Sequence, residues 1–194
     1  MSTGLDVSEL TDEQLAADAA REGSDGPAFV ALVDRYRQRV WRVCYRLMNN
    51  AEDANDAAQE VFVRLFFNRT KFLGQSKYST WVHGVAIRTC LTLRRGRGRR
   101  WRRESEAGQR AGERERQAAT DHSTEVSLDL TQILETLPEE DRAMLILKYS
   151  EGNSYDDLAA MFDLSVSACK MRISRAREKL KQRFPQHNFG TELE

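Results

Sequence analysis

Apolar side chains recur at helical spacing along most of the chain. The clearest stripe runs through residues 28–48, where positions i, i+3, i+4 and i+7 share one face of a helix. Its members are Phe29, Leu32, Val33, Tyr36, Val40, Val43, Cys44 and Leu47. No long stretch alternates between apolar and polar residues, and the chain holds only three prolines. The pattern predicts an all-α protein.

Residues that start or stop helices stand between the predicted helices. They are Thr11, Gly23, Pro27, Asn49 and Asn50. Thr11 suits the N-cap of a helix whose first turn is acidic, and Pro27 suits the first turn of the long helix. Two further helices are predicted, over 51–69 and 80–95, on either side of a polar break that contains Gly74.

Large apolar side chains almost vanish between residues 94 and 127, where Trp101 is the one exception before Val126. A segment of this composition cannot bury a core, so we expect a flexible, partly helical linker. The chain is therefore predicted to hold two small helical domains joined by a charged linker. The expected boundaries are an acidic N-terminal extension over 1–27, a domain over 28–95, the linker over 96–127, a second domain over 128–184 and a tail over 185–194.

The second domain contains a helix-turn-helix pattern. Its first helix is expected over Tyr155–Phe162, where the small Ala159 lets two helices approach closely, and Asp163 is tolerated at a left-handed turn position. The second helix should begin near Ser165 or Ser167. Its predicted buried stripe is Val166, Cys169, Ile173, Ala176 and Leu180. The opposite face carries Ser167, Lys170, Arg172, Ser174, Arg175 and Arg177. Such a face is typical of a DNA-reading helix, and the alternative is a bundle helix with a charged outer side.

The formal net charge of zero hides a strong segregation of charge along the chain. Residues 1–34 carry eight acids against one base, residues 94–103 carry seven arginines, and residues 165–184 carry seven bases against one acid. Basic zones of this density suit a polyanion, most simply nucleic acid. The alternative is a solvated helix face or a charged tail. The acidic N-terminal stretch could also fold back over a basic face and mask it.

Several classes of chemistry find no support in the sequence. Cys44, Cys90 and Cys169 are far apart and odd in number, which argues against a disulfide framework and fits a reducing cytosol. The sequence shows no metal-ligand spacing, no phosphate-binding loop and no nucleophile paired with a base. We therefore expect no cofactor and no enzymatic activity. The chain also lacks an apolar run of membrane-spanning length and the features of a signal peptide.

Two motifs resemble one known family, in that family's order. The segment "LPEEDRAMLILKYSEGNSYDDLAAMFDLSVSACKMRISRAREKL" resembles region 4 of bacterial sigma factors, which recognises the promoter −35 element. The segments "DANDAAQEVFVRL" and "KFLGQSKYSTWVHGVAIRTCLTLRR" resemble their region 2. The short linker and the missing middle domain are typical of the extracytoplasmic-function (ECF) subfamily. The chain departs from the usual pattern at Thr89, Asp163, Ala168 and Cys169. These departures affect which promoter sequence is expected and not the assignment to the family.

The resemblance implies a protein without catalytic chemistry that acts through its partners in the bacterial cytoplasm. Sigma factors bind the RNA polymerase core at the β′ clamp helices and the β flap, direct it to promoter DNA and help to open the duplex. An anti-sigma factor is a further expected partner. The alternative is a helix-turn-helix regulator that binds DNA without being a polymerase subunit. Such a regulator would need an effector or phosphoacceptor domain, and residues 1–95 show neither pattern.

The resemblance also implies three sets of contact residues. The positions that match the polymerase-docking surface are Asp56, Gln59, Glu60, Arg64 and Leu65. Those implied at the −10 element are Asn68, Lys71, Lys77, Tyr78, Thr80, Trp81, Arg88, Arg94 and Arg95. Those implied at the −35 element are Ser165, Ser167, Lys170, Arg172, Arg175 and Arg177.

The loop before the fourth predicted helix has the chemistry that single-stranded DNA requires. Lys71 and Lys77 can attract phosphates, while aromatic rings offer surfaces on which unstacked bases can lie. We expect Trp81 to belong partly to the core, and Lys77 and Tyr78 to lie nearer to DNA. The helix over 80–95 is expected to lie along the promoter, with the arginine-rich segment leaving its C-terminal end.

Overall fold

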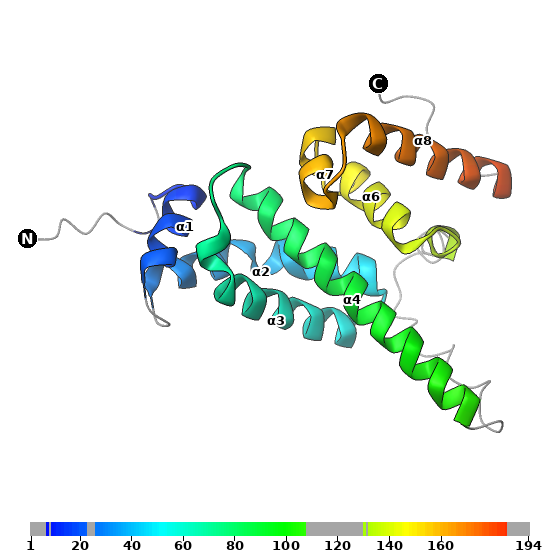
Figure 1. Cartoon of the computed structure of the whole chain (residues 1–194), viewed down its shortest axis with the longest axis horizontal. Coiled ribbons are helices and arrows are strands. Elements are labelled where there is room, and N and C mark those ends of the chain that lie inside the picture. Colours follow the sequence, from blue (N-terminus) through cyan, green and yellow to red (C-terminus); the bar gives the residue numbers. More distant parts are fainter. Residues whose placement is uncertain (1–6, 8, 23–25, 108–129, 131, 186–194) are drawn as a thin grey trace, which may run out of the picture.

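The computed structural model describes residues 7–107 and 130–185, except residues 8, 23–25 and 131. Within that part the chain is helical and contains no strand, which confirms the all-α prediction (Figure 1). The elements are α1 (Asp12–Arg21), α2 (Pro27–Met48), α3 (Ala51–Phe67), the 3-10 helix η1 (Arg69–Lys71), α4 (Tyr78–Ala107), α6 (Glu139–Tyr149), α7 (Tyr155–Phe162) and α8 (Val166–Arg183).

The predicted helix ends are confirmed at the N-terminal helices. The Thr11 hydroxyl accepts from the Gln14 amide at 3.2 Å, and the Gln14 side chain accepts from the Thr11 amide at 2.8 Å, which forms a capping box. Pro27 opens α2. Asn49 ends α2 in the left-handed conformation at φ 58°, and the Asn50 side chain caps α3.

Helices α1 to α4 form one packed unit, the N-terminal unit. Leu15, Ala16 and Ala19 of α1 are buried in it, so the described part of the acidic N-terminal stretch belongs to this unit. Its acids are used there as well: Asp12 accepts from Arg35 and Tyr36. Helix α1 therefore does not cover α8 or the arginine-rich end of α4.

Helices α6 to α8 form the C-terminal unit, in which α7 and α8 make the predicted helix-turn-helix. Helix α7 has the predicted bounds, and Asp163 follows it at φ 55°. Cys169, Ile173, Ala176 and Leu180 of the predicted stripe are buried, whereas Val166 is only half-buried.

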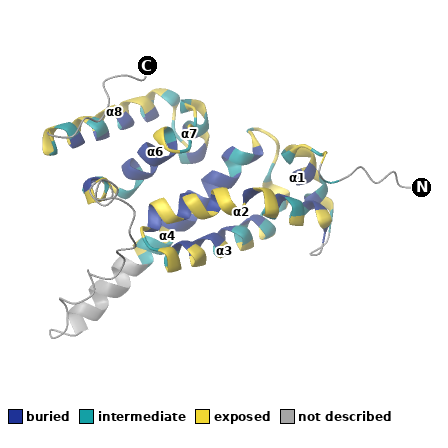
Figure 2. Ribbon diagram, turned by 180° about the vertical axis from the view of Figure 1, so that it is seen from behind, coloured by how far each residue is buried: buried dark blue, intermediate teal, exposed yellow. Residues whose placement is uncertain are grey.

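Helix α4 lies between the two units (Figures 1 and 2). It packs on α1, α2 and α3, and it also contacts α6 and α7. Its segment 82–87 is buried at every residue, so no face of this segment is open to solvent. Helix α4 also continues to Ala107, which is well beyond the predicted end at Arg95.

Substitutions at Asp163 test the turn of the helix-turn-helix. A β-branched side chain tolerates a positive φ poorly, so Asp163→Val should lower the free energy of unfolding by about 1–2 kcal/mol. Asp163→Gly should leave it equal or higher, because glycine adopts this conformation without steric cost. Urea unfolding followed by circular dichroism measures both. Equal stability of the valine and aspartate proteins would contradict this geometry.

Candidate nucleic-acid interface

One stripe along α3 faces away from the core. Asp56 and Gln59 are exposed, and Glu60 accepts from Arg64 Nε at 2.7 Å on the same helix. Leu65 was predicted to belong to this surface, and that prediction was wrong, because only 2% of its surface is exposed. Its i+4 spacing from the buried Val61 turns it inward.

Two apolar residues that the sequence reasoning missed complete the stripe. Val63 and Phe67 are exposed, Phe67 by 73%. They follow Asp56, Gln59 and Glu60 at i+3 and i+4 steps, so the helical spacing of the polar residues was the signal that pointed to them. The stripe combines exposed aromatic and aliphatic groups with a charge pair, which suits a protein partner.

In the loop predicted to read the −10 element, the lysines and the aromatic rings lie in different environments. Lys71 and Lys77 are exposed, whereas Tyr78 is only 3% exposed and packs edge-on against Tyr36 and Phe72. Burial raises the pKa of Tyr78. The placement of Tyr78 near DNA was therefore wrong. Trp81 is half-buried and its ring centroid lies 5.6 Å from that of Tyr78, so it is partly core as expected.

The rest of this loop offers backbone and one large apolar side chain to solvent. Leu73 is 74% exposed, next to Gly74 at φ 69°. The Asn68 side chain is occupied locally, since its amide donates to the Arg64 carbonyl at 2.7 Å. Thr89, at which the chain departs from the family pattern, is buried in the N-terminal unit and donates to the Val85 carbonyl.

Two predicted −10 residues in the first half of α4 contact the C-terminal unit. Thr80 is buried and donates to Asp157 Oδ1 at 2.7 Å. Arg88 donates to the Met161 carbonyl at 3.2 Å, and burial lowers its pKa. In this arrangement α7 stands where the sequence reasoning expected DNA.

Two further predicted −10 residues, Arg94 and Arg95, contact the start of α6. Arg94 Nε lies 3.1 Å from Glu139 Oε1, and Arg94 also donates to the Leu47 carbonyl. Arg95 lies 3.0 Å from Glu140 Oε1. The side of α4 that was expected to face the promoter therefore contacts the C-terminal unit in this structure.

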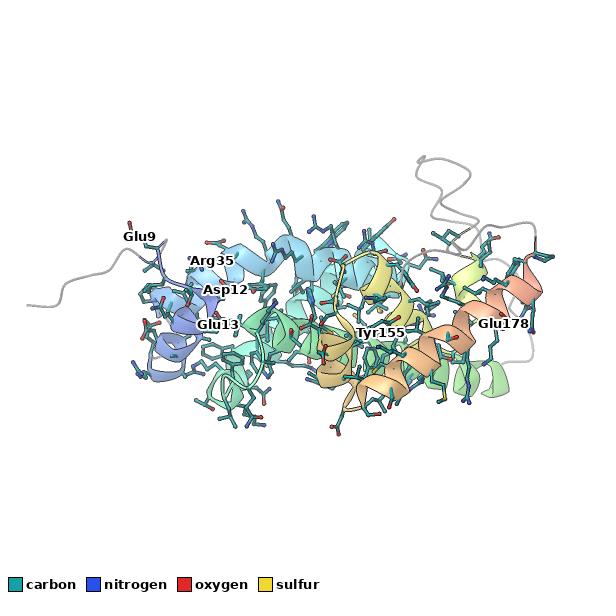
Figure 3. All side chains as sticks on the ribbon, turned by 90° about the horizontal axis from the view of Figure 1, so that it is seen from above. Glu9, Asp12, Glu13, Arg35, Tyr155 and Glu178 are labelled. Carbon is teal, nitrogen blue, oxygen red and sulfur yellow. The ribbon has the colours of Figure 1, made fainter. Side chains whose placement is uncertain are left out.

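Helix α8 and its N-cap expose four of the six predicted −35 residues, and Figure 3 shows the side chains along α8, where Glu178 is labelled. The Ser165 hydroxyl caps the helix by accepting from the Ala168 amide at 3.2 Å. Ser167, Lys170 and Arg175 are exposed. Lys170 lies over the Tyr155 ring, at 5.4 Å from its centroid. These side chains form a polar and basic surface from the N-cap of the helix to Arg175.

Arg172 and Arg177 lie nearer to α6. Arg172 Nε contacts Asp141 Oδ1 at 2.6 Å, and its Nη2 contacts Glu140 Oε2 at 2.8 Å. Arg172 thus joins α8 to α6, and its predicted place on the outer face was wrong. Arg177 is half-buried, with its guanidinium 5.8 Å from the Tyr149 ring centroid.

The comparisons with known proteins agree with this geometry. Residues 32–100 match Sigma-70 region 2, and residues 127–180 match Sigma-70, region 4. The chain is 31% identical to the ECF RNA polymerase sigma factor SigW of Bacillus subtilis, over 81% of this chain and 89% of that one. The chain belongs to the ECF family of RNA polymerase sigma factors. It is also 29% identical to the ECF sigma-E factor of Escherichia coli, over 90% of this chain and 95% of that one.

Two solved structures share the fold. The sigma factor RpoE of Bartonella quintana, crystallised with the anti-sigma factor NepR, aligns with a TM-score of 0.61 at 22% identity, over 79% of this chain and 94% of that one. CnrH, solved with the cytosolic domain of CnrY, aligns with a TM-score of 0.66 at 22% identity, over 91% and 99%. As a member of this family, the chain is a polymerase-binding sigma factor that directs promoter recognition.

The part of the chain that the structure describes holds neither a metal site nor a membrane span. No cluster of three His, Cys, Asp or Glu side chains that could hold a metal ion occurs there. Nor does any described helix have the length and apolar character that a membrane span requires.

The contact between Glu140 and its arginines should make the protein sensitive to acid. Arg172, and then Arg95, hold the pKa of Glu140 below its ordinary value. The resulting stability is present above the ordinary glutamate pKa of about 4.3 and is lost as the pH falls through the lower folded value. Unfolding should therefore become easier below about pH 4.3, and less so in Glu140→Gln. Identical pH profiles for the two proteins would contradict the contact.

Proposed function

We propose that this ECF sigma factor reads the −35 element with the exposed face of α8 between Ser167 and Arg175. The observation that carries the proposal is the helix-turn-helix, whose second helix presents Ser167, Lys170 and Arg175 outward while Cys169 and Ile173 fix it to the core. Polar residues at the start of such a helix reach base edges, and basic residues hold phosphates. In this proposal Arg172 positions α8 through Asp141 and does not read bases.

The exposed stripe of α3 is the proposed docking surface for the polymerase core at its β′ clamp helices. Asp56, Gln59, Glu60 and Arg64 supply charge and hydrogen bonds, and Val63 and Phe67 supply apolar area. The stripe lies on the side of α3 away from the core of its own unit. The C-terminal unit would in turn meet the β flap.

The loop between η1 and α4 is the proposed reader of the −10 element. Lys71 and Lys77 would attract the phosphates of the separated strand, and the exposed Leu73 would contact an unstacked base. Arg88, Arg94 and Arg95 would hold the DNA backbone once α6 and α7 have moved away from α4. Duplex opening would then require no catalytic group of the chain, and the proposal includes no enzymatic activity and no cofactor.

A separate anti-sigma protein is a further proposed partner, acting in the bacterial cytoplasm. Its support is the fold shared with the sigma factor RpoE of Bartonella quintana, which was crystallised with the anti-sigma factor NepR. A regulator that binds DNA without polymerase is the weaker alternative, because the N-terminal unit matches Sigma-70 region 2 and not a sensory domain.

A charge exchange on α3 tests the docking surface. Glu60→Arg combined with Arg64→Glu keeps an ion pair at the same spacing, so the helix should lose only a few tenths of a kcal/mol. Affinity for the polymerase core should fall by at least about tenfold, because the partner then meets reversed charges. Binding of labelled sigma factor to purified core measures this.

The matched control exchanges the pair Asp34 and Arg37 on α2, which is exposed and joined at 3.8 Å. That variant should bind core normally. Core affinity unchanged by the α3 exchange, with an unchanged circular dichroism spectrum, would contradict the assignment of α3.

Two arginines of α8 should behave differently. Arg175→Ala should reduce transcription from promoters that need a −35 element by about tenfold or more, with normal stability, since one lost base contact costs about 1–3 kcal/mol. Arg172→Ala should lower the unfolding midpoint, because it leaves the buried Asp141 without its cation. Lys179→Ala, on the exposed C-terminal half of α8, is the control. Full activity of Arg175→Ala on every promoter would exclude α8 as the −35 reader.

A further inference from the structure

We propose that three acids of α6, Glu139, Glu140 and Asp141, hold the free chain in a closed form. This acidic triad pairs with arginines that would otherwise contact promoter DNA or position the helix that reads it. The inference rests on the proposed function, which assigns Arg94 and Arg95 to the −10 backbone and Arg172 to the placement of α8. It adds a form of regulation that lies within a single chain and needs no second protein.

The triad forms the first turn of α6 and faces both units. Towards the N-terminal unit, Glu139 contacts Arg94 at 3.1 Å and Arg95 at 4.0 Å, and Glu140 contacts Arg95 at 3.0 Å. Within the C-terminal unit, Glu140 and Asp141 hold Arg172. Glu140 is shared between an arginine of each unit, so it couples the closure of the units to the position of α8.

The triad has the chemistry of a substitute for DNA phosphates. A guanidinium group binds carboxylate and phosphate oxygens with the same fork of N–H donors. Acids in the first turn of a helix are favoured by the helix dipole, which stabilises the triad at the start of α6. A carboxylate and a phosphate cannot hold Arg94 or Arg95 at the same position, so triad and promoter compete for them.

Contacts with α7 also cover the side of α4 that is proposed to face the promoter. Asp157 accepts from Thr80, and the Met161 carbonyl accepts from Arg88. Arg46 of α2 pairs with Glu151, just before α7. Because α7 contacts α4 at Thr80 and Arg88, on either side of the buried segment 82–87, DNA cannot reach this part of α4 until the two units separate.

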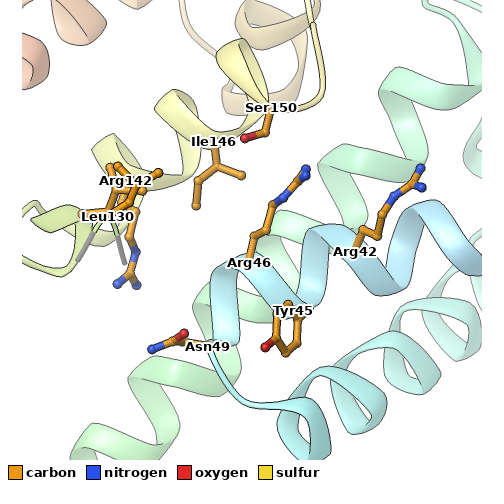
Figure 4. A pocket seen from close by; sticks show the side chains of 9 residues that line it. Arg42, Tyr45, Arg46, Asn49, Leu130, Arg142, Ile146 and Ser150 are labelled. Atoms are coloured by element: carbon orange, nitrogen blue, oxygen red, sulfur yellow. The ribbon is translucent and has the colours of Figure 1, made fainter. Parts of the chain in front are cut away.

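Several features of the contact between the two units indicate that it can open. Its ion pairs remain partly hydrated, with the Arg95 side chain 55% exposed, and such pairs are individually weak. A cavity of about 370 Å³ also remains between α2 and the C-terminal unit, lined in part by Arg42, Arg46 and Arg142 (Figure 4). Arg142 is only 4% exposed, and its Nε has no hydrogen-bond partner among the described residues. An unsatisfied buried donor reduces the stability of the closed form.

The surfaces that remain open in the closed chain suggest the order of events. The exposed stripe of α3 and the outer face of α8 lie outside the closed contact. Polymerase can therefore bind α3 while the units are still together. Separation of the units would follow on the enzyme and would release Arg94 and Arg95 where promoter DNA is available.

The test is the double variant Glu139→Gln/Glu140→Gln, which removes the carboxylates facing Arg94 and Arg95 and leaves Asp141 to hold Arg172. Without polymerase, its radius of gyration in small-angle scattering should exceed that of the original chain. Its affinity for a promoter fragment at low salt should rise by about tenfold, the equivalent of about 1.4 kcal/mol. The difference should shrink as salt screens the ion pairs.

The matched control is Asp34→Asn/Glu178→Gln, which removes the same charge at exposed positions, one in each unit. It should keep the original radius and gain less DNA affinity than the triad variant. A triad variant with the radius and DNA affinity of the control would overturn the lock, even if it transcribes normally with core. Absence of promoter-specific transcription by all three proteins would instead refute the proposed function, while scattering would still report closure.

Discussion

Helix α4 is buried from both sides, and the rest of the arrangement depends on this burial. A helix without a solvent face is stable only where neighbours cover its whole circumference. Over residues 82–87 these neighbours are the N-terminal unit on one side and α7 on the other. The same helix carries Arg88, Arg94 and Arg95, which we propose to contact promoter DNA. On that proposal, stability of the free chain and promoter binding compete for one helix.

This competition explains why a chain of zero net charge is so strongly divided into acidic and basic segments. Arg94 and Arg95 in the middle of α4 and Arg172 of α8 find carboxylate partners in the first turn of α6 when DNA is absent. These arginines remain partly exposed, so each pair is weak on its own. The internal pairs keep the basic residues in position, and they are weak enough to be replaced by phosphates.

Local structure could be predicted from the sequence, whereas the closed arrangement could not. Helix ends at Thr11, Pro27 and Asn49 and the turn at Asp163 follow from capping and backbone preferences, which act within a few residues. Helical spacing also identified the buried stripe of α8. These features need no knowledge of what packs against each helix.

The errors arose where burial depends on a distant part of the chain. Tyr78 and Thr80 have polar groups suited to DNA, but the former lies in an aromatic cluster and the latter bonds to Asp157. Arg172 belongs to a basic face by spacing, yet two acids some thirty positions earlier hold it. Leu65 shows the opposite case, since its spacing from Val61 placed it in the core and the family resemblance drew it to the surface.

The central claim is that the two units are closed in the free chain and separate on polymerase. Its most direct test is the distance between fluorescent probes on Glu52→Cys of α3 and Lys179→Cys of α8, since the native Cys44, Cys90 and Cys169 are buried. We expect one short-distance population in the free chain, and a longer distance once core polymerase is added. A long distance in the free chain, or the same distance with and without core, would contradict the account.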